Sequence, residues 1–308
     1  MNLLFYSAAG DAPAVWRSAL ATVLPQAQLH AWAADAELPA CDYALVWKPP
    51  AAVFARQNQL RAVFNLGAGV DAVLAMDTLP VGVPLIRLED AGMALQMVEY
   101  VLHAVLRRYR RFDDYAAQAA RGEWRPLPLG RRPTIGVLGL GALGLTVAAA
   151  LGDLGFPVRG WSRTRKELEG GEAFAGAAEL ERFLSACDVL ICLLPLTTET
   201  RGILNRRTLS ALRRGALLIN IARGDHLVED DLLAALAEGQ VGHAVLDVCR
   251  DEPLPAGHPL WTHPRVTLTP HIAALTLVED SAAQIAEKIR RLEAGEAVSG
   301  LVDLKRGY

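Results

Sequence analysis

The sequence predicts an α/β protein built from two doubly wound parallel sheets. Two series of short apolar runs alternate with helix-like stretches, which is the βαβ pattern of a parallel sheet with helices on its faces. In the second series the runs are continuously apolar rather than alternating, as expected for strands that are buried on both faces. The length of 308 residues exceeds the size at which one core keeps growing, so two domains are expected.

The first ninety residues supply the strands of the first sheet. The five candidates are Leu3–Tyr6, Leu29–Trp32, Tyr43–Trp47, Ala62–Asn65 and Pro84–Arg87. From about Met93 to Arg121 the chain has no Pro and no Gly, which predicts one long helix. Four arginines lie in the second half of this helix, namely Arg107, Arg108, Arg110 and Arg111. They form either a solvated helix face or part of a subunit-packing arm.

A loop rich in Pro and Arg leads into the second series. Its strand candidates are Thr134–Leu138, Pro157–Trp161, Asp188–Leu193, Ala216–Asn220, His243–Val248 and Val266–Thr269. A final helix is predicted over Val278–Glu293, before a polar tail.

Composition excludes several classes of protein. The 31 Lys and Arg against 34 Asp and Glu give a net charge of −3, without the broad basic surface of a nucleic-acid binder. A content of 52% hydrophobic and 21% charged residues excludes disorder. No apolar run reaches the roughly 18 residues that span a bilayer, and the N-terminus lacks a basic signal-peptide region, so we expect a soluble cytoplasmic protein.

No metal site is expected. The four cysteines lack the paired spacing of a zinc site and are interpreted as small buried hydrophobes in a reducing compartment. The histidines at 30, 103, 226 and 243 share no metal-ligand spacing with carboxylates or cysteines.

A glycine-rich turn predicts a dinucleotide site. Residues 139–144 have the pattern GxGxxG, directly after one predicted strand and before a helix. Gly139 permits the tight turn, Gly141 lets a pyrophosphate approach the backbone, and Gly144 lets helix and strand pack closely. Ala142 and Leu143 then offer N–H groups at the positive end of the helix.

The end of the next strand indicates which dinucleotide binds. An NAD site needs an acidic residue there for the ribose hydroxyls, and none is present. Ser162 can donate to a 2′-phosphate, and Arg163, Arg165 and Lys166 can neutralise it. We therefore predict NADPH (NADP⁺) rather than NADH; the alternative is a solvated basic turn.

Polar residues follow three successive strands of the second series. Arg223 lies in the segment Asn220–Gly224, Glu252 in Asp247–Leu254, and His271 in Thr269–Ala273. Ligands bind outside the carboxyl ends of parallel strands, so Arg, Glu and His in three such loops predict a catalytic site.

With these motifs, and with Leu194–Thr197 and the run His258–Trp261, the sequence resembles the D-isomer-specific 2-hydroxyacid dehydrogenases along its whole length. The resemblance implies a discontinuous, flavodoxin-like catalytic domain (1–92 plus 279–308), a Rossmann NADP-binding domain (93–278), a cleft between them, and a homodimer with helix 93–121 as an arm. It also implies further cofactor contacts from Leu194, Pro195, Thr200, Ile221, Ala222, Asp247 and Ala273.

The resemblance further implies a carboxylate-binding loop at Leu66–Asp71, where backbone N–H groups of Ala68 and Gly69 contact the substrate. Trp47 either lines the pocket or belongs to the core.

The resemblance implies reduction of small 2-keto acids, such as glyoxylate and hydroxypyruvate, by hydride transfer. His271 suits the proton donor because imidazole titrates near neutral pH. Glu252 would stabilise the imidazolium, and Arg223 would hold the substrate carboxylate and polarise its carbonyl. Two alternatives stay open: a broader dehydrogenase for bulkier 2-keto acids, and an NADPH-binding sensor or corepressor-type module.

Overall fold

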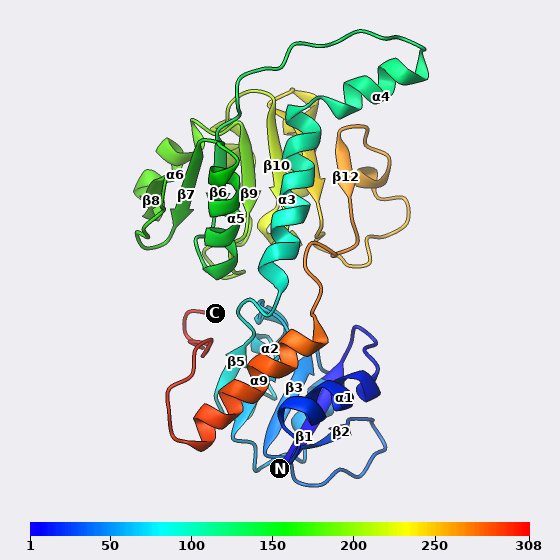
Figure 1. The fold of residues 1–308 in the computed structure, drawn as a ribbon, viewed down its shortest axis with the longest axis vertical. Coiled ribbons are helices and arrows are strands. Elements are labelled where there is room, and N and C mark those ends of the chain that lie inside the picture. The colour runs from blue at the N-terminus through cyan, green and yellow to red at the C-terminus, as the bar shows by residue number, and fades with distance from the viewer. The chain divides into compact units, whose positions relative to one another are not determined.

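The computed structural model describes residues 1–308, and the chain folds into two compact units. Unit 1 comprises Met1–Met93 and Thr276–Tyr308, and unit 2 comprises Ala94–Leu275. Each unit contains one parallel sheet with helices on both faces (Figure 1). The predicted fold class of two doubly wound parallel sheets is confirmed.

Unit 1 has five strands: β1 (Asn2–Ser7), β2 (Gln28–Ala31), β3 (Tyr43–Trp47), β4 (Ala62–Asn65) and β5 (Leu85–Arg87). Their order is β2-β1-β3-β4-β5, the flavodoxin-like order, and every pair is parallel. Helices α1 (Pro13–Val23) and α9 (Val278–Glu293) pack together on one face, where Trp16 of α1 contacts Phe5. The short helices η1 (Ala51–Phe54) and α2 (Asp71–Leu74) join the core on the other face.

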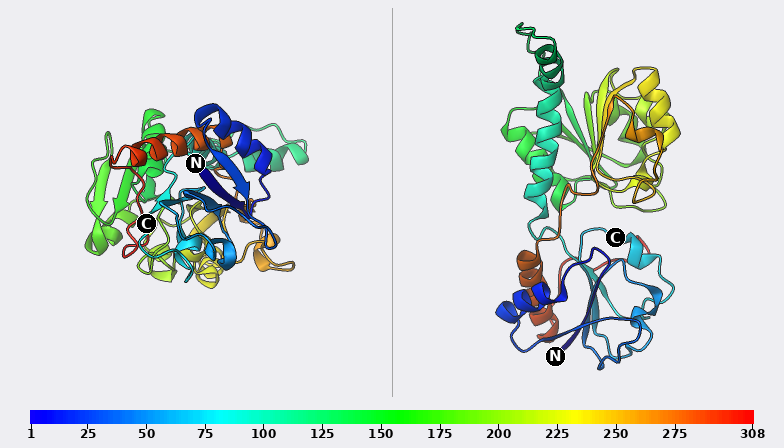
Figure 2. Two further views of the ribbon diagram at one scale, coloured as in Figure 1. Left: turned by 90° about the horizontal axis from the view of Figure 1, so that it is seen from below. Right: turned by 90° about the vertical axis from the view of Figure 1, so that its right-hand side faces the viewer.

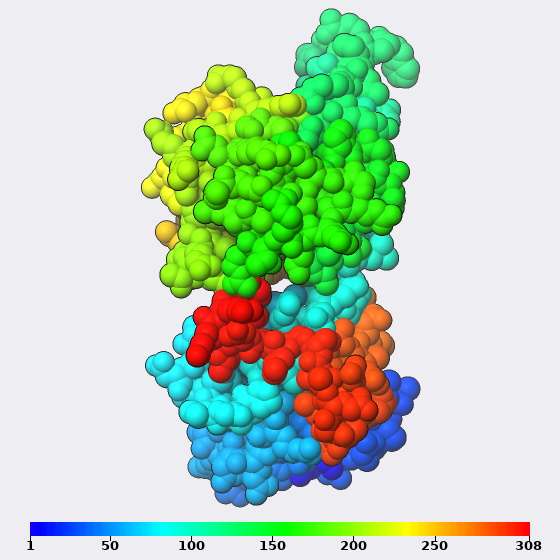
Figure 3. Space-filling model, turned by 90° about the vertical axis from the view of Figure 1, so that its left-hand side faces the viewer, coloured from blue at the N-terminus to red at the C-terminus, as the bar shows by residue number.

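The last residues of the chain complete unit 1 (Figure 3, red beside cyan). Leu301 pairs with Ile86 as an antiparallel bridge. Lys288 on α9 is buried, and its Nζ donates to the carbonyls of Arg87 at 3.1 Å and Ser299 at 2.9 Å. Helix α9 and the C-terminal tail are therefore integral parts of this unit.

Unit 2 has seven strands: β6 (Ile135–Leu138), β7 (Val158–Ser162), β8 (Glu172–Ala175), β9 (Val189–Cys192), β10 (Ala216–Asn220), β11 (Val241–Leu246) and β12 (Val266–Leu268). Their order is β12-β11-β10-β9-β6-β7-β8, and every pair is parallel. The order reverses between β6 and β9, and ligands bind at such a switch point in open α/β sheets.

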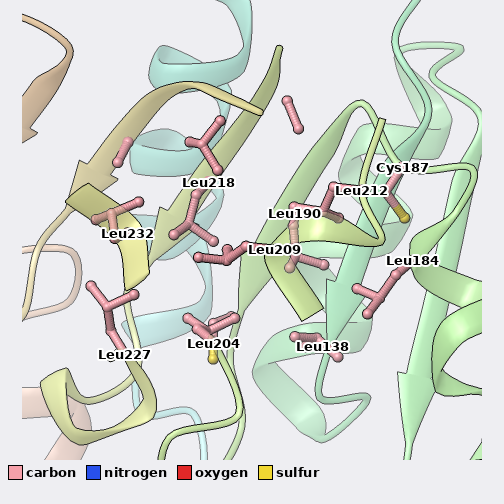
Figure 4. Close-up of a cluster of buried hydrophobic side chains, with 14 of the residues drawn as sticks. Leu138, Leu184, Cys187, Leu190, Leu204, Leu209, Leu212, Leu218, Leu227 and Leu232 are labelled. Carbon is pink, nitrogen blue, oxygen red and sulfur yellow. The ribbon is translucent and has the colours of Figure 1, made fainter. Parts of the chain in front are cut away.

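Alternate side chains of these strands enter two separate cores. Leu138, Leu190 and Leu218 join the cluster under α6 (Gly176–Leu184), α7 (Arg206–Ser210) and α8 (Glu229–Ala237) (Figure 4). Val137 and Ile191 enter the other cluster, under α3 (Met93–Tyr109) and α5 (Ala142–Asp153). Burial on both faces explains why these strands are continuously apolar.

The prediction of one helix over 93–121 is wrong, because the chain forms two helices there. Helix α3 ends at Tyr109 and α4 spans Phe112–Ala120, with Arg111 between them in the left-handed conformation at φ 60°. The right-hand view of Figure 2 shows α4 extending past the end of the sheet of unit 2. Basic residues end α3 and acidic residues begin α4, which suits the dipoles of two separate helices.

One strand was not predicted, and several boundaries differ. Strand β8 is a short edge strand, so it lacks the continuous apolar run that marks its buried neighbours. The strand expected over His243–Val248 begins and ends two residues earlier. The final helix Val278–Glu293 has the predicted bounds. None of the helices is both long and apolar enough to span a bilayer.

Candidate active site

The turn between β6 and α5 forms a cradle of glycines. Gly139 has φ +105°, and a Cβ there would lie 2.7 Å from the carbonyl oxygen of Leu193. A side chain at Gly144 would overlap the carbonyl of Gly139. Gly141 differs, because a Cβ on it would meet no atom within 4 Å. The packing of the protein therefore requires glycine at positions 139 and 144, whereas the space beside Gly141 is open.

The N-terminus of α5 has no capping group of its own. Gly141 is the N-cap residue and supplies no side chain, and the first turn contains no acidic residue. The first N–H groups of a helix have no partner within that helix, so those of Ala142, Leu143 and Gly144 point outward. Uncapped N–H groups beside an open glycine suit a pyrophosphate, and this site therefore fits a dinucleotide.

Basic residues follow the end of β7, as predicted, and some already have partners. Ser162 Oγ donates to the Thr164 carbonyl at 2.7 Å. Arg165 donates to the Ala173 carbonyl and to Glu179 of α6, each at 2.6 Å. The backbone N–H of Ala175 and the Arg165 guanidinium together lower the pKa of the Glu179 carboxyl. Exposed side chains at Arg163 and Lys166 complete the basic segment.

The loop after β9 is held by its own hydroxyl groups. Thr200 Oγ1 donates to the carbonyl of Pro195 at 2.7 Å and accepts from the N–H of Thr197 at 2.8 Å. Leu194 is buried beneath this loop. The loop therefore has a fixed shape beside the switch point of the sheet.

Arg223 lies in the loop after β10, and a buried amide fixes that loop. The Asn220 side chain donates to the Arg223 carbonyl at 3.0 Å and accepts from the Ala222 N–H at 3.3 Å. The half-buried Arg223 guanidinium donates to the Ala222 carbonyl at 2.7 Å. A side chain at Gly224 would overlap the backbone of Cys249, so this glycine lets the Arg223 loop pack directly on the loop after β11. Ile221 and Ala222 are buried.

Asp247, at the end of β11, organises the loop that carries His271. Its carboxylate accepts from Thr269 Oγ1 at 2.6 Å and from the N–H groups of Ile272 and Ala273 at 2.8 Å. Thr269 also contacts the Tyr100 hydroxyl of α3 at 2.6 Å. Burial raises the pKa of Tyr100 to about 12, so this hydroxyl is neutral at physiological pH.

His271 and Glu252 form a hydrogen-bonded pair at this edge of the sheet. His271 Nδ1 lies 2.9 Å from Glu252 Oε2, and each side chain is about a third exposed. The other oxygen, Glu252 Oε1, accepts from the Cys249 N–H at 3.3 Å. His271 has φ +58°, a conformation that the contacts of Asp247 hold in place. Since Nδ1 faces Glu252, Nε2 is the nitrogen left for a substrate.

The structure therefore brings Arg223, Glu252 and His271 onto the carboxyl-end loops of β10, β11 and β12, three adjacent strands of unit 2. Trp47, Ala68 and Gly69 belong to unit 1. There the Asn65 amide donates to the carbonyls of Gly67 at 2.8 Å and Gly69 at 3.0 Å, which fixes the loop. The ring of the half-buried Trp47 closes over Gly67, where a Cβ would lie 2.6 Å from Cζ3.

Several organising residues were not predicted from the sequence. Tyr100 and Thr269 support the His271 loop, the buried His226 contacts the Arg223 loop, and Glu179 holds Arg165. Asn220 begins the Arg223 segment itself, and an amide at the end of a buried strand is a sequence signal for a fixed loop. The sequence around Tyr100 contains no such signal.

The thiols and metal-ligand types do not form a further site. No three His, Cys, Asp or Glu residues are placed to hold a metal ion. Cys41, Cys187 and Cys192 are buried and Cys249 is half-buried, all as free thiols. Burial raises the pKa of Cys192 to about 12 and that of Cys249 to about 11, so both are neutral at physiological pH.

Comparison with known families identifies this arrangement. Residues 102–273 match the family described as D-isomer specific 2-hydroxyacid dehydrogenase, NAD binding domain. The chain is 52% identical to the glyoxylate/hydroxypyruvate reductase A of Serratia proteamaculans (strain 568), over the full length of both chains. The chain belongs to the D-isomer specific 2-hydroxyacid dehydrogenase family.

Solved structures of relatives of this family agree. One is the structure of a D-isomer specific 2-hydroxyacid dehydrogenase from Xanthobacter autotrophicus Py2 in complex with NADPH and MES. It is 44% identical to this chain and superposes with a TM-score of 0.95. The match covers 100% of this chain and 99% of the other. The NADPH-dependent glyoxylate/hydroxypyruvate reductase of Sinorhizobium meliloti, in complex with NADP and sulfate, is 36% identical with a TM-score of 0.93, at the same coverage. The family resemblance predicted from the motifs is confirmed.

Proposed function

We propose that this protein reduces small 2-keto acids, in particular glyoxylate to glycolate and hydroxypyruvate to D-glycerate, with NADPH. The observation that carries the proposal is the 2.9 Å pair of His271 and Glu252, whose loops follow β12 and β11, beside the Arg223 loop after β10. The full-length identity of 52% with a glyoxylate/hydroxypyruvate reductase A supports the choice of substrate.

The chemistry follows from the side chains of unit 2. NADPH, when bound, supplies the hydride that the carbonyl carbon receives. His271 donates its Nε2 proton to the forming alkoxide, a step typically worth about 10²–10⁴ in rate. Glu252 stabilises the imidazolium and orients the ring through Nδ1. Arg223 holds the substrate carboxylate and polarises the carbonyl with its planar guanidinium.

The cofactor is assigned to two segments of unit 2. The glycine cradle and the start of α5 hold the pyrophosphate, and Ser162, Arg163, Arg165 and Lys166 hold the 2′-phosphate. Support for NADPH over NADH comes from the absence of an acidic residue at positions 162–166 and from the NADPH and NADP bound in the two solved relatives. The buried residues near the switch point, including Leu194, Ile221, Ala222 and Ala273, are assigned to the cofactor pocket.

Unit 1 is assigned to the substrate. The backbone N–H groups of Ala68 and Gly69 receive the carboxylate, and Trp47 borders the pocket. We place the substrate domain at residues 1–92 with 279–308, and the cofactor domain at 93–278.

We also propose a homodimer in the cytoplasm. The segment after α3 exposes apolar side chains that a second copy would cover: Phe112 is 55% exposed, Trp124 99% and Leu129 59%. Large exposed apolar groups of this kind are typical of interaction surfaces. The four free thiols are consistent with a reducing compartment.

A steady-state panel tests the function. Glyoxylate, hydroxypyruvate, pyruvate and a bulkier 2-keto acid are each mixed with NADPH or NADH, and nicotinamide absorbance is followed. We expect the first two with NADPH to have the highest kcat/KM; a higher value for the bulkier acid favours the broader dehydrogenase. A flat trace with every acid favours an NADPH-binding sensor and refutes the proposal.

His271→Ala tests the proton donor. We expect kcat to fall by about 10²-fold or more while NADPH binding, measured by nicotinamide fluorescence, is unchanged. His30→Ala, on β2 of unit 1, is the matched control and is expected to turn over normally. Normal turnover by His271→Ala refutes the assignment.

A further inference from the structure

A buried histidine lies between two of the loops at the candidate active site. His226, in the short helix η2 (Gly224–His226), has no exposed surface. Its Nδ1 lies 3.1 Å from the Arg223 carbonyl oxygen, and its Nε2 lies 3.3 Å from the Pro195 carbonyl oxygen. The two ring nitrogens thus contact two different loops, the Arg223 loop after β10 and the Pro195 loop after β9.

Both neighbours of the ring are hydrogen-bond acceptors, which constrains what the ring can do. A neutral imidazole has one N–H, so it donates to one carbonyl at a time, whereas an imidazolium donates to both. Burial lowers the pKa of His226, although the two carbonyls act in the opposite direction, so the ring is neutral at physiological pH. The neutral ring therefore donates a hydrogen bond to one of the two carbonyls and makes only a packing contact with the other.

The two carbonyls are themselves fixed parts of the loops. The Pro195 carbonyl also accepts from Thr200 Oγ1 at 2.7 Å, and the Arg223 carbonyl also accepts from the Asn220 amide at 3.0 Å. The His226 carbonyl accepts from the Leu204 N–H at 2.8 Å, which anchors the histidine to the segment that follows the Pro195 loop. The position of the ring is thus set from both sides.

We propose that His226 is a positioning residue that sets the separation of the Pro195 loop from the Arg223 loop. Because Arg223 is assigned to the keto acid and Pro195 to the dinucleotide, the ring aligns the two reactants with each other. This inference rests on the proposed function. Small displacements matter here, since a misplacement of about 1 Å can cost about 10²-fold in rate.

Two isosteric substitutions separate the two contacts. In His226→Asn the amide N–H₂ takes the place of Nδ1 and reaches only the Arg223 carbonyl. In His226→Gln the amide N–H₂ takes the place of Nε2 and reaches only the Pro195 carbonyl. Each variant is assayed for KM and kcat with glyoxylate and for the Kd of NADPH by nicotinamide fluorescence, and its Tm is recorded. His30→Asn and His30→Gln, on the edge strand β2, are matched controls.

The inference predicts opposite effects of the two variants. His226→Asn should keep the KM for glyoxylate within about twofold and raise the NADPH Kd about fivefold, because the Pro195 loop loses its contact with the ring. His226→Gln should raise the KM for glyoxylate about fivefold, because the Arg223 loop loses its contact with the ring, and should leave the NADPH Kd unchanged. The His30 variants should match the wild type in both constants.

Three results would overturn the inference. One is a lower Tm with both binding constants unchanged, which indicates a structural role only. A second is an equal change of both constants in the Asn and Gln variants. The third is failure of both variants to fold. An inactive wild type would instead refute the proposed function, and the fluorescence titrations, which need no turnover, would still judge the effect of His226 on the NADPH side.

Discussion

Alanine at Gly139 should damage the fold of unit 2. Gly139 has φ +105°, and holding a residue with a side chain in such a sparsely populated conformation costs about 1–3 kcal/mol. The new Cβ would lie 2.7 Å from the Leu193 carbonyl oxygen, so that oxygen must withdraw by roughly 0.7 Å to reach 3.4 Å, where ordinary contact begins. Such overpacking costs about 1–3 kcal/mol. We expect Gly139→Ala to lose about 3 kcal/mol, or about 6–12 °C in Tm for a unit of this size.

Alanine at Gly141 should have the opposite profile. Its φ of −79° suits any residue, and its Cβ would meet no protein atom within 4 Å. The Tm should therefore stay within about 2 °C of the wild type. The methyl group would occupy the space assigned to the pyrophosphate, so we expect the NADPH Kd to rise about tenfold or more, which is about 1.4 kcal/mol.

Thermal unfolding and nicotinamide fluorescence titration measure the two effects separately. Gly152→Ala is the control, because Gly152 lies in α5, meets no atom within 4 Å and is expected to gain about 0.5–1 kcal/mol as a helical alanine. If Gly141→Ala binds NADPH as tightly as the wild type, the cradle is not the pyrophosphate site. If Gly139→Ala unfolds at the wild-type temperature, the argument from backbone conformation is refuted.

Three further predictions concern the surrounding residues. Arg223→Lys should raise the KM for glyoxylate about tenfold or more, because an ammonium cannot replace a two-pronged guanidinium, and unchanged steady-state constants would exclude the assigned role. Arg165→Ala should raise the KM for NADPH while that for NADH stays constant; an equal rise for both would show that the Glu179 pair serves the fold alone. Burial raises the pKa of Cys249 to about 11, so roughly one part in a thousand of this thiol is thiolate at pH 8. Its alkylation by iodoacetamide, followed by mass spectrometry, should therefore be slow and should accelerate as the pH rises. Rapid modification at pH 7 would contradict the effect of burial on this pKa.

The strands of both sheets could be predicted because a strand that is buried on both faces is a continuous run of apolar residues in the sequence. Ala62–Asn65 and Ala216–Asn220 have the predicted bounds, since a buried parallel strand is apolar from end to end. Strand β8 is an edge strand with Glu172 at its first, exposed position, and it contains no such run. The strength of the sequence signal thus follows how completely each strand is covered.

The break between α3 and α4 shows a different limit. No Pro or Gly marks it, because Arg111 itself adopts the left-handed conformation. What holds the break is a pair of contacts across it, Arg107 with Asp113 and Arg111 with Asp114, each at 2.7 Å. Basic residues followed by acidic ones were visible in the sequence, but the same order also suits salt bridges along one continuous helix.

In the candidate site, too, some residues could be predicted from the sequence and others could not. Arg223, Glu252 and His271 were predictable because each follows a strand, and the ends of parallel strands share one edge of the sheet. The supporting contacts were not, because they join residues far apart in the chain. Tyr100 and Thr269 are separated by 169 positions, and only the packing of α3 against the sheet brings them together.

The composition of unit 1 from both ends of the chain has a consequence for synthesis. Helix α1, with its buried Trp16, is made early, whereas α9, which packs against it, is made among the last residues. Until Ile285 and Ile289 of α9 leave the ribosome, the side of α1 that packs against α9 has no permanent cover. The strands of unit 2, by contrast, are all synthesised before that moment. Unit 1 therefore completes its packing only after α9 has been synthesised, and a stop codon before residue 278 would leave the surface that α9 covers exposed to water.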